Sequence, residues 1–303
     1  MQKDSYTNQE LMLDVGDGHT LYIQDWGNPD AQTPIIFLHG GPGSQVKPKH
    51  KAVFDPETHR VIFFDQRGCG QSTPAGSLEH NTTDKLVQDI TKIADEFGIE
   101  TFTIHGTSWG SALALAYAIA YPTRVANLVI GGIFTGSKAE ADWIDRGQFR
   151  NFFPEVWEAY LSRTPEQYRD NPSAYHFDKI FNGSLEEQKA SSYAYGCLEG
   201  AVIKLDDRFE GEDYETYDPS GTRIEVFYLV NGCFLPDRYI LDNAAILTMP
   251  VYIVQGRYDM VCPPATAYEL HQKLPNSQIY WTLSGHHIEH EGQNIFKSII
   301  AGL

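Results

Sequence analysis

The sequence predicts an α/β fold in which a mostly parallel sheet, flanked by helices, is interrupted by an inserted and mainly helical cap. Over residues 1–134, short apolar runs typical of buried strands alternate with longer helical stretches. The stretch 135–242 is helical, aromatic and acidic, is broken up by prolines, and contains no clear apolar strand. The alternation resumes over 243–303. We therefore expect one core formed by 1–134 and 243–303, with the cap 135–242 inserted into it.

The first part of the core contains six runs with the apolar character of strands. Two of these runs, 34–40 and 60–68, contain four successive apolar residues, Ile35–Leu38 and Val61–Phe64. Such continuous runs are typical of parallel strands that are buried on both faces. The six expected strands occupy residues 10–15, 19–27, 34–40, 60–68, 101–106 and 125–133.

Two helices are expected in the same part of the chain, at 82–98 and 109–121. Either Thr82 or Thr83 is suited to cap the first of them, and Gly98 is suited to end it. In the last part of the chain, the same pattern predicts a strand, a helix, a second strand and a final short helix. The first three of these occupy residues 249–256, 264–274 and 278–285.

The composition excludes several classes of protein. The chain has 303 residues, of which 42% are hydrophobic and 21% charged, and this balance argues against disorder. Its formal net charge of −17 argues against a nucleic-acid partner, because phosphate binding needs a basic face. We interpret the acidic surface first as an aid to solubility; a role in electrostatic steering would favour cationic substrates.

The cysteines and the apolar segments bear on location. No pair of cysteines forms a C-x-x-C motif or has the spacing of zinc ligands, which predicts reduced thiols. The chain shows neither the apolar core of a signal peptide nor an uncharged run of about 18 apolar residues. We therefore expect a cytoplasmic protein without a membrane partner, a metal or a cofactor. The four cysteines are Cys69, Cys197, Cys233 and Cys262.

A small-residue turn around one serine joins an expected strand to an expected helix. The turn reads Gly106-Thr107-Ser108-Trp109-Gly110, and this G-x-S-x-G pattern in strand–turn–helix context is typical of a nucleophile elbow. The small residues allow a tight bend that exposes the serine hydroxyl. The alternative is a serine that only caps the helix, so the prediction depends on finding partners for it.

A serine needs a base to take its proton and a carboxylate to orient that base. Asp259 follows the strand 249–256, and His286 follows the strand 278–285, so both are expected at the carboxyl edge of the sheet. The order serine, acid, histidine along the chain is that of nucleophile-elbow hydrolases. We predict Ser108, Asp259 and His286 as the catalytic residues.

Other residues could in principle take these roles. Asp237 and Asp242 fall at the exit of the cap rather than after a core strand, and His271 lies inside an expected helix. The run from His286 to His290 also resembles a metal-binding cluster, but it lacks the H-E-x-x-H arrangement. We interpret His287 and His290 as solvated loop residues.

A glycine-rich loop, "FLHGGPGS" at 37–44, follows another buried strand. Acyl transfer needs backbone N–H groups directed at the developing oxyanion, and a glycine turn presents them without a side chain in the way. The expected donors are the N–H groups of Gly41 and Trp109. A tight loop without a ligand is the alternative. The turn "DQRGCGQS" at 65–72 is expected to shape the same edge by hydrogen bonds, without a chemical step of its own.

Taken together, these motifs resemble those of the prolyl iminopeptidases. The segments "HGGPG", "DQRGCGQS", "SWGSALALAYA", "QGRYDMVCP" and "SGH" occur in that family's order, and the resemblance covers essentially the whole chain. It implies an α/β-hydrolase fold and a serine peptidase that releases N-terminal proline from small peptides with a free N-terminus. It also implies the same catalytic residues, Ser108, Asp259 and His286.

The resemblance further implies a role for two glutamates of the cap. "YGCLEGA" and "TRIEVFYLVNGCF" match stretches whose glutamates hold the substrate's α-amine, which assigns that role to Glu199 and Glu225. A protonated amine that leaves water must regain a charged partner, so paired carboxylates suit this task. Without the resemblance, a glutamate in so acidic a segment would be interpreted as a solvated surface residue.

The chain departs from the family pattern near the substrate. Thr107 stands where glycine is usual, Leu198 stands where tryptophan is usual, and the segment after Glu225 and the "HHIEHEG" loop also differ. These changes leave the predicted catalytic residues intact, but they affect the expected pocket for the first residue of the substrate. The alternatives are therefore a broader aminopeptidase, an amidase or an esterase, and, in another class, a catalytically silent binding protein.

Overall fold

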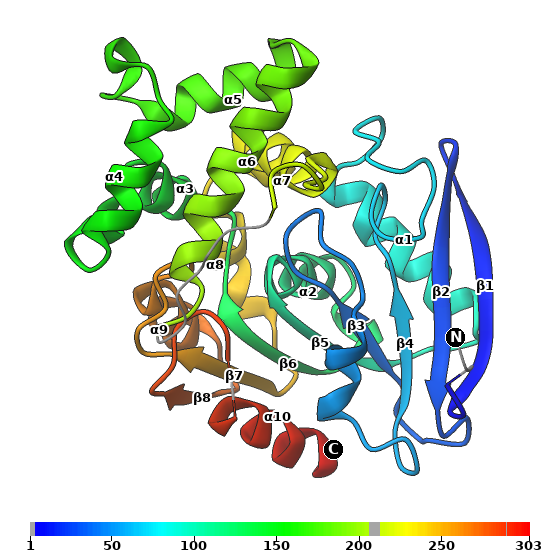
Figure 1. Ribbon diagram of the computed structural model, residues 1–303. Coiled ribbons are helices and arrows are strands. Elements are labelled where there is room, and N and C mark those ends of the chain that lie inside the picture. Colours follow the sequence, from blue (N-terminus) through cyan, green and yellow to red (C-terminus); the bar gives the residue numbers. More distant parts are fainter. Residues whose placement is uncertain (1–3, 206–212, 289) are drawn as a thin grey trace.

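The computed structural model describes residues 4–205, 213–288 and 290–303 and contains one eight-stranded sheet (Figure 1). In spatial order the strands are β1-β2-β4-β3-β5-β6-β7-β8. The bounds of the strands are β1 Thr7–Gly16, β2 His19–Gly27, β3 Ile35–Leu38, β4 Arg60–Phe64, β5 Phe102–Ser108, β6 Val125–Ile133, β7 Val251–Gly256 and β8 Ser277–Thr282.

The sheet is parallel from β4 to β8, and β2 pairs antiparallel with both β1 and β4. The predicted α/β class is therefore confirmed. The expected strand 60–68 was too long: β4 ends at Phe64, and the following residues turn away from the sheet. That turn is polar and hydrogen-bonded to neighbouring loops, and the strand ends where the apolar residues end.

Alternate side chains of the central strands feed two apolar layers. On one face, residues such as Ile36 and Ile104 pack with α1 Thr83–Glu96, α2 Trp109–Ala120, α8 Tyr239–Asn243 and α9 Pro264–Lys273. On the other face, residues such as Phe37 and Val129 pack with α10 Glu291–Ala301. Both faces are covered, which explains why the central parallel strands are rich in apolar residues at successive positions.

The ends of α1 agree with the expected signals. Thr82 is the N-cap residue and has an extended backbone, with φ −133° and ψ 160°. Gly98 follows the C-cap with φ +64°, a conformation that side chains rarely allow. The final helix, α10, has 11 residues and is longer than the short helix expected there.

Between β6 and β7, the described residues form helices and no strand; apart from α8, which packs on the sheet, the longer of these helices gather above the carboxyl edge of the sheet (Figure 1). They have an apolar cluster of their own, to which Val261 and Cys262 from the loop after β7 also belong. The longer helices are α3 Lys138–Asp145, α4 Pro154–Ser162, α5 Pro172–Asn182, α6 Leu185–Val202 and α7 Ser220–Val230. We keep 135–242 as an interpretation of the cap's limits.

Among the described residues, no helix combines the length and the apolar character that crossing a membrane requires.

Candidate active site

Ser108 stands at a sharp bend between β5 and α2. Its backbone has φ +58° and ψ −130°, a strained conformation for a residue with a side chain. Glycines flank it because the bend brings backbones together: a Cβ on Gly106 would lie 2.5 Å from the carbonyl oxygen of Gly110, and one on Gly110 would lie 2.2 Å from that of Leu38. The strand–turn–helix context expected of the serine motif is present.

The bend is held by hydrogen bonds on its helix side. The hydroxyl of Ser111 donates to the carbonyl oxygen of Ser108 at 2.7 Å and accepts from the N–H of Phe134 at 3.0 Å. Ser108 itself lines a cavity of about 560 Å³, together with His286, Glu199 and Glu225. This volume is typical of a site for a small ligand.

His286 and Asp259 meet although 27 residues separate them. The Nδ1 atom of His286 lies 2.9 Å from Oδ2 of Asp259, whose side chain is fully buried. The other oxygen, Oδ1, accepts from the N–H groups of Val261 and Cys262 at 2.9 and 2.7 Å. Gln255 donates to Oδ2 at 3.2 Å. The carboxylate is therefore fixed, and it orients the imidazole.

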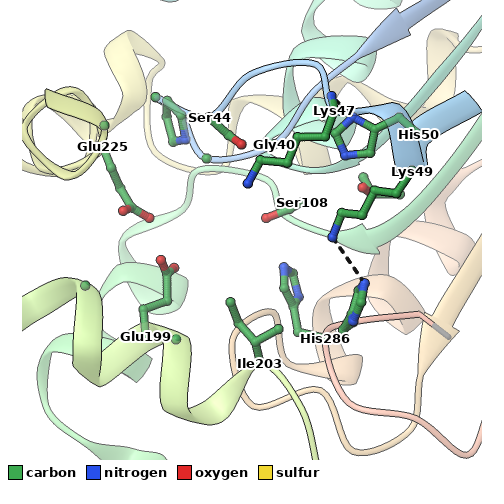
Figure 2. Close-up of a pocket in the computed structure, with 18 of the residues that line it drawn as sticks. Gly40, Ser44, Lys47, Lys49, His50, Ser108, Glu199, Ile203, Glu225 and His286 are labelled. Carbon is green, nitrogen blue, oxygen red and sulfur yellow. Dashed lines mark hydrogen bonds between the residues drawn. The ribbon is translucent and has the colours of Figure 1, made fainter. Parts of the chain in front are cut away.

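The imidazole of His286 points toward the Ser108 hydroxyl (Figure 2). Gly132 packs close to both residues: a Cβ there would be 3.2 Å from Cε1 of His286 and 3.6 Å from the N atom of Ser108. Burial lowers the pKa of His286, but the charge of Asp259, the hydrogen bond to it and the charge of Glu199 raise it, and the net pKa is above the ordinary 6.5.

The alternative acids and histidines lie elsewhere. Asp237 and Asp242 are exposed, and the first accepts a hydrogen bond from the N–H of Lys138. His271 bonds to Ser277 within the α9–β8 region. His290 is exposed, whereas His287 differs from the expectation, because it is half-buried and lines the cavity. Residue 289 of the suspected metal cluster lies outside the described residues, and the described ones contain no group of three metal-ligating side chains.

Hydrogen bonds join the glycine-rich loop to the serine turn through Gln66. Its N–H donates to Nε2 of His39 at 3.0 Å, and its side-chain amide donates to the carbonyl oxygen of His39 at 2.9 Å. The indole N–H of Trp109 donates to Oε1 of Gln66 at 2.9 Å. Burial lowers the pKa of His39, which keeps Nε2 able to accept. Gly41 lines the same cavity as Ser108.

The turn at 65–72 is a hub of hydrogen bonds. Asp65 accepts from the N–H groups of Val46 and Gln71 at 2.8 and 2.9 Å. Arg67 makes a bidentate contact with Asp89 at 2.6 and 2.8 Å, and both side chains are fully buried. This turn fixes the glycine-rich loop on one side and α1 on the other.

Glu199 of α6 and Glu225 of α7 face each other across the cavity wall (Figure 2). Burial, repulsion by Glu199 and a hydrogen bond to it raise the pKa of Glu225 well above its ordinary value. Burial also raises the pKa of Glu199. Two neighbouring carboxylates that are removed from water disfavour each other's ionisation, and this effect favours retention of a proton by the pair.

A small recess of about 40 Å³ opens beside Ser108 and the two glutamates. No sequence motif marks this recess, because its apolar residues come from distant segments and resemble ordinary core residues. Leu198, one of the departures from the family pattern, does not line either cavity; it is buried in the apolar cluster of the cap. The recess is lined in part by Phe134, Ile144, Tyr195, Leu229 and Cys262.

The fold and the site define an enzyme class. Residues 33–293 match the family model described as "alpha/beta hydrolase fold". A solved esterase from Exiguobacterium antarcticum shares this fold, with a TM-score of 0.67 at 17% identity over 97% of this chain and 98% of that one. The chain is therefore a hydrolase of the α/β-hydrolase fold.

Within that class, the curated relatives give the narrower family. A proline iminopeptidase of Arabidopsis thaliana is 40% identical over 88% of this chain and 72% of its own length. One of Xylella fastidiosa is 37% identical over 96% of this chain and 94% of its own length. The chain belongs to the proline iminopeptidase family, as the motifs predicted. A solved proline iminopeptidase of Mycobacterium smegmatis, 21% identical, has the same fold, with a TM-score of 0.64 over 97% of both chains.

Proposed function

We propose that this protein hydrolyses the peptide bond after an N-terminal proline through a serine acyl-enzyme. The observation that carries the proposal is the convergence of Ser108, the His286–Asp259 pair and two buried glutamates on one cavity. Membership of the proline iminopeptidase family supports the choice of substrate. The substrates are small peptides with a free N-terminus.

In the first step, the Oγ atom of Ser108 attacks the carbonyl carbon of the N-terminal proline. His286 takes the serine proton at Nε2, because its Nδ1 atom is bonded to Asp259. The carboxylate of Asp259 stabilises the imidazolium that forms. The tetrahedral oxyanion accepts from the N–H groups of Gly41 and Trp109; the latter begins α2, where a helix leaves its N–H without an intrahelical acceptor.

In the second step, the carbon–nitrogen bond breaks. His286 donates its proton to the departing nitrogen, and the rest of the peptide leaves with a new amino terminus. A water molecule, deprotonated by His286, then attacks the acyl-enzyme and releases free proline. Both half-reactions use the same donors to the oxyanion, so no further group is required.

Glu199 and Glu225 receive the imino terminus of the substrate. In the absence of a cation, the pair keeps a proton because burial and mutual repulsion raise the pKa of Glu225. A secondary ammonium group displaces that proton and forms charge-assisted hydrogen bonds. Only the first carbonyl then reaches Ser108, which excludes internal peptide bonds. The apolar recess beside Ser108 is suited to the pyrrolidine ring.

The thiols support a cytoplasmic location for this activity. Cys69, Cys233 and Cys262 are buried free thiols, which persist in a reducing compartment.

A substrate panel tests the proposal directly. The panel comprises proline anilide, alanine anilide, leucine anilide, N-acetylproline anilide and a short-chain ester, each measured as kcat/KM. We expect proline anilide to exceed the other anilides by at least about tenfold, and N-acetylproline anilide to be inert, because acetylation removes the cation that the glutamates bind. If the N-acetylated compound is cleaved as well as proline anilide, the amine-binding role is wrong. Preference for the ester would then favour an esterase.

A further inference from the structure

Two lysines line the same cavity as the nucleophile and the paired glutamates. Lys47 and Lys49 belong to the loop that follows β3, whereas the glutamates belong to the cap helices. In Figure 2 the ammonium group of Lys47 points toward Ser108, and Lys49 lies on the far side of Ser108 from the two carboxylates. Lys49 and the two glutamates thus lie on opposite sides of Ser108, and Lys47 extends toward the serine; we call the part of the cavity lined by these two lysines the basic wall.

The loop that carries these lysines is fixed by its own contacts. The N–H of Val46 donates to Asp65 at 2.8 Å, and the N–H of Lys47 donates to Nδ1 of His50 at 3.0 Å. The ring of His50 packs against Phe37 with 4.9 Å between centroids. Burial, followed by the charge of Lys49, lowers the pKa of His50 to about 3, so it stays neutral and keeps accepting. These contacts hold the backbone from which the two lysines extend.

The ammonium group of Lys49 is directed toward the loop of the catalytic histidine. Its Nζ atom lies 3.5 Å from Nε2 of His287. Lys47, in contrast, forms no ion pair with any residue in the part of the chain that the structure describes. Among the described residues, Lys47 is thus a cation at the cavity that no carboxylate contacts directly, and such a cation is suited to an anionic group of a ligand.

We infer that Lys47, assisted by Lys49, binds the C-terminal carboxylate of a very short substrate, so that the enzyme prefers dipeptides with a free C-terminus. The inference rests on the proposed function, which places the imino terminus at Glu199 and Glu225. A bound dipeptide has one cation and one anion, separated by about 3.3–3.6 Å per residue when extended. The cavity presents two carboxylates on one side of Ser108, the ammonium group of Lys47 beside the serine and that of Lys49 beyond it.

The same charge pattern predicts a preference for short substrates. A longer peptide carries its carboxylate past the basic wall and places a neutral peptide group beside the lysines. Such a peptide therefore gains no charge-assisted contact with the lysines. A peptide amide does the same at unchanged length. The cavity volume of about 560 Å³ agrees with a ligand of a few residues.

The test compares prolylalanine with prolylalaninamide, which differ only in the terminal carboxylate. The measured quantity is the ratio of their kcat/KM values, so that any loss of folded protein cancels. We expect a ratio of about ten in the wild type, since partly exposed charge pairs contribute modestly. The ratio should fall to about one in the double variant Lys47→Gln/Lys49→Gln and be largely kept in Lys47→Arg/Lys49→Arg.

Lys297→Gln is the matched control, because Lys297 is exposed on α10 and does not line the cavity. Its ratio should equal that of the wild type. Raising the salt concentration to about 0.5 M should lower the wild-type ratio by screening. A wild-type ratio near one, or an unchanged ratio in the double variant, overturns the inference. Proline anilide, which has no carboxylate, tests the proposed function separately. If proline anilide is not cleaved, the proposed function itself is wrong.

Discussion

The Nδ1 atom of His286 lies 2.9 Å from Oδ2 of Asp259, in a contact that joins the ends of two adjacent parallel strands. β7 and β8 pair in register, so the loops that follow them emerge at the same edge of the sheet. Asp259 follows β7 and His286 follows β8. The sheet therefore brings the acid and the base together, while the bend after β5 supplies the serine.

Removal of the serine hydroxyl should abolish turnover without unfolding the protein. We expect Ser108→Ala to lower kcat for proline anilide by about 10⁴- to 10⁶-fold, because no other group can form the acyl-enzyme. The melting temperature checks the fold of the variant, and a fluorophosphonate probe should label the wild type but not the variant. Near-wild-type turnover in Ser108→Ala would contradict a mechanism in which Ser108 is the nucleophile.

The reactivity of Ser108 should depend on the titration of His286. The net pKa of His286 lies above 6.5 because Asp259 and Glu199 outweigh the effect of burial, so the base is available only at higher pH. The rate of labelling by a neutral fluorophosphonate should rise with pH, with a midpoint above 6.5. Such a probe has no amine, so the glutamate pair does not complicate the profile.

Asp259→Asn should slow the same labelling and shift its midpoint to lower pH, because the variant removes a charge that raises the pKa of His286. An unchanged midpoint would show that Asp259 does not control the base. The neighbouring histidine serves as the comparison: His286→Gln should lose several orders of magnitude, and His287→Gln much less. A larger loss in His287→Gln than in His286→Gln would mean that His287, and not His286, is the base.

The two glutamates should matter for peptides and little for esters. Removing one partner of a desolvated charge pair typically costs about 2–5 kcal/mol, so Glu199→Gln or Glu225→Gln should lose about 30- to 1,000-fold in kcat/KM for proline anilide. A short-chain ester makes no such contact and should change far less. Equal losses for both substrates would indicate general damage to the cavity rather than loss of amine binding.

The buried ion pair between Arg67 and Asp89 should support the fold. Arg67→Met leaves an unpaired carboxylate in a fully buried position, which typically costs about 3–5 kcal/mol of unfolding free energy. Urea denaturation at neutral pH measures this loss. Arg146→Met is the control, because Arg146 pairs with Asp142 on the exposed surface of the cap and should cost several times less. Similar losses in both variants would contradict a structural role for the buried pair.

Much of the core was predictable because its signals are local. The strands β2 and β6 agree with their expected bounds, 19–27 and 125–133. In β6, burial on the sheet explains the run of apolar residues from Leu128 to Ile133. The serine turn was recognisable for a similar reason: close backbone approaches at Gly106 and Gly110 exclude any other residue there. The predicted ends of strands were less accurate. The strand expected at 60–68 ends at Phe64, where a polar turn begins.

The sequence by itself determined the α/β class, the order of the candidate catalytic residues and, through shared motifs, the family. Only the tertiary structure decided which charged side chains meet. Glu199 and Glu225 are 26 positions apart on two helices, and each alone looks like any glutamate of an acidic surface. Lys47 and Lys49 likewise resemble solvated lysines until the loop after β3 places them in the cavity. Charge pairing depends on distance and burial, and neither is encoded in any short stretch of sequence.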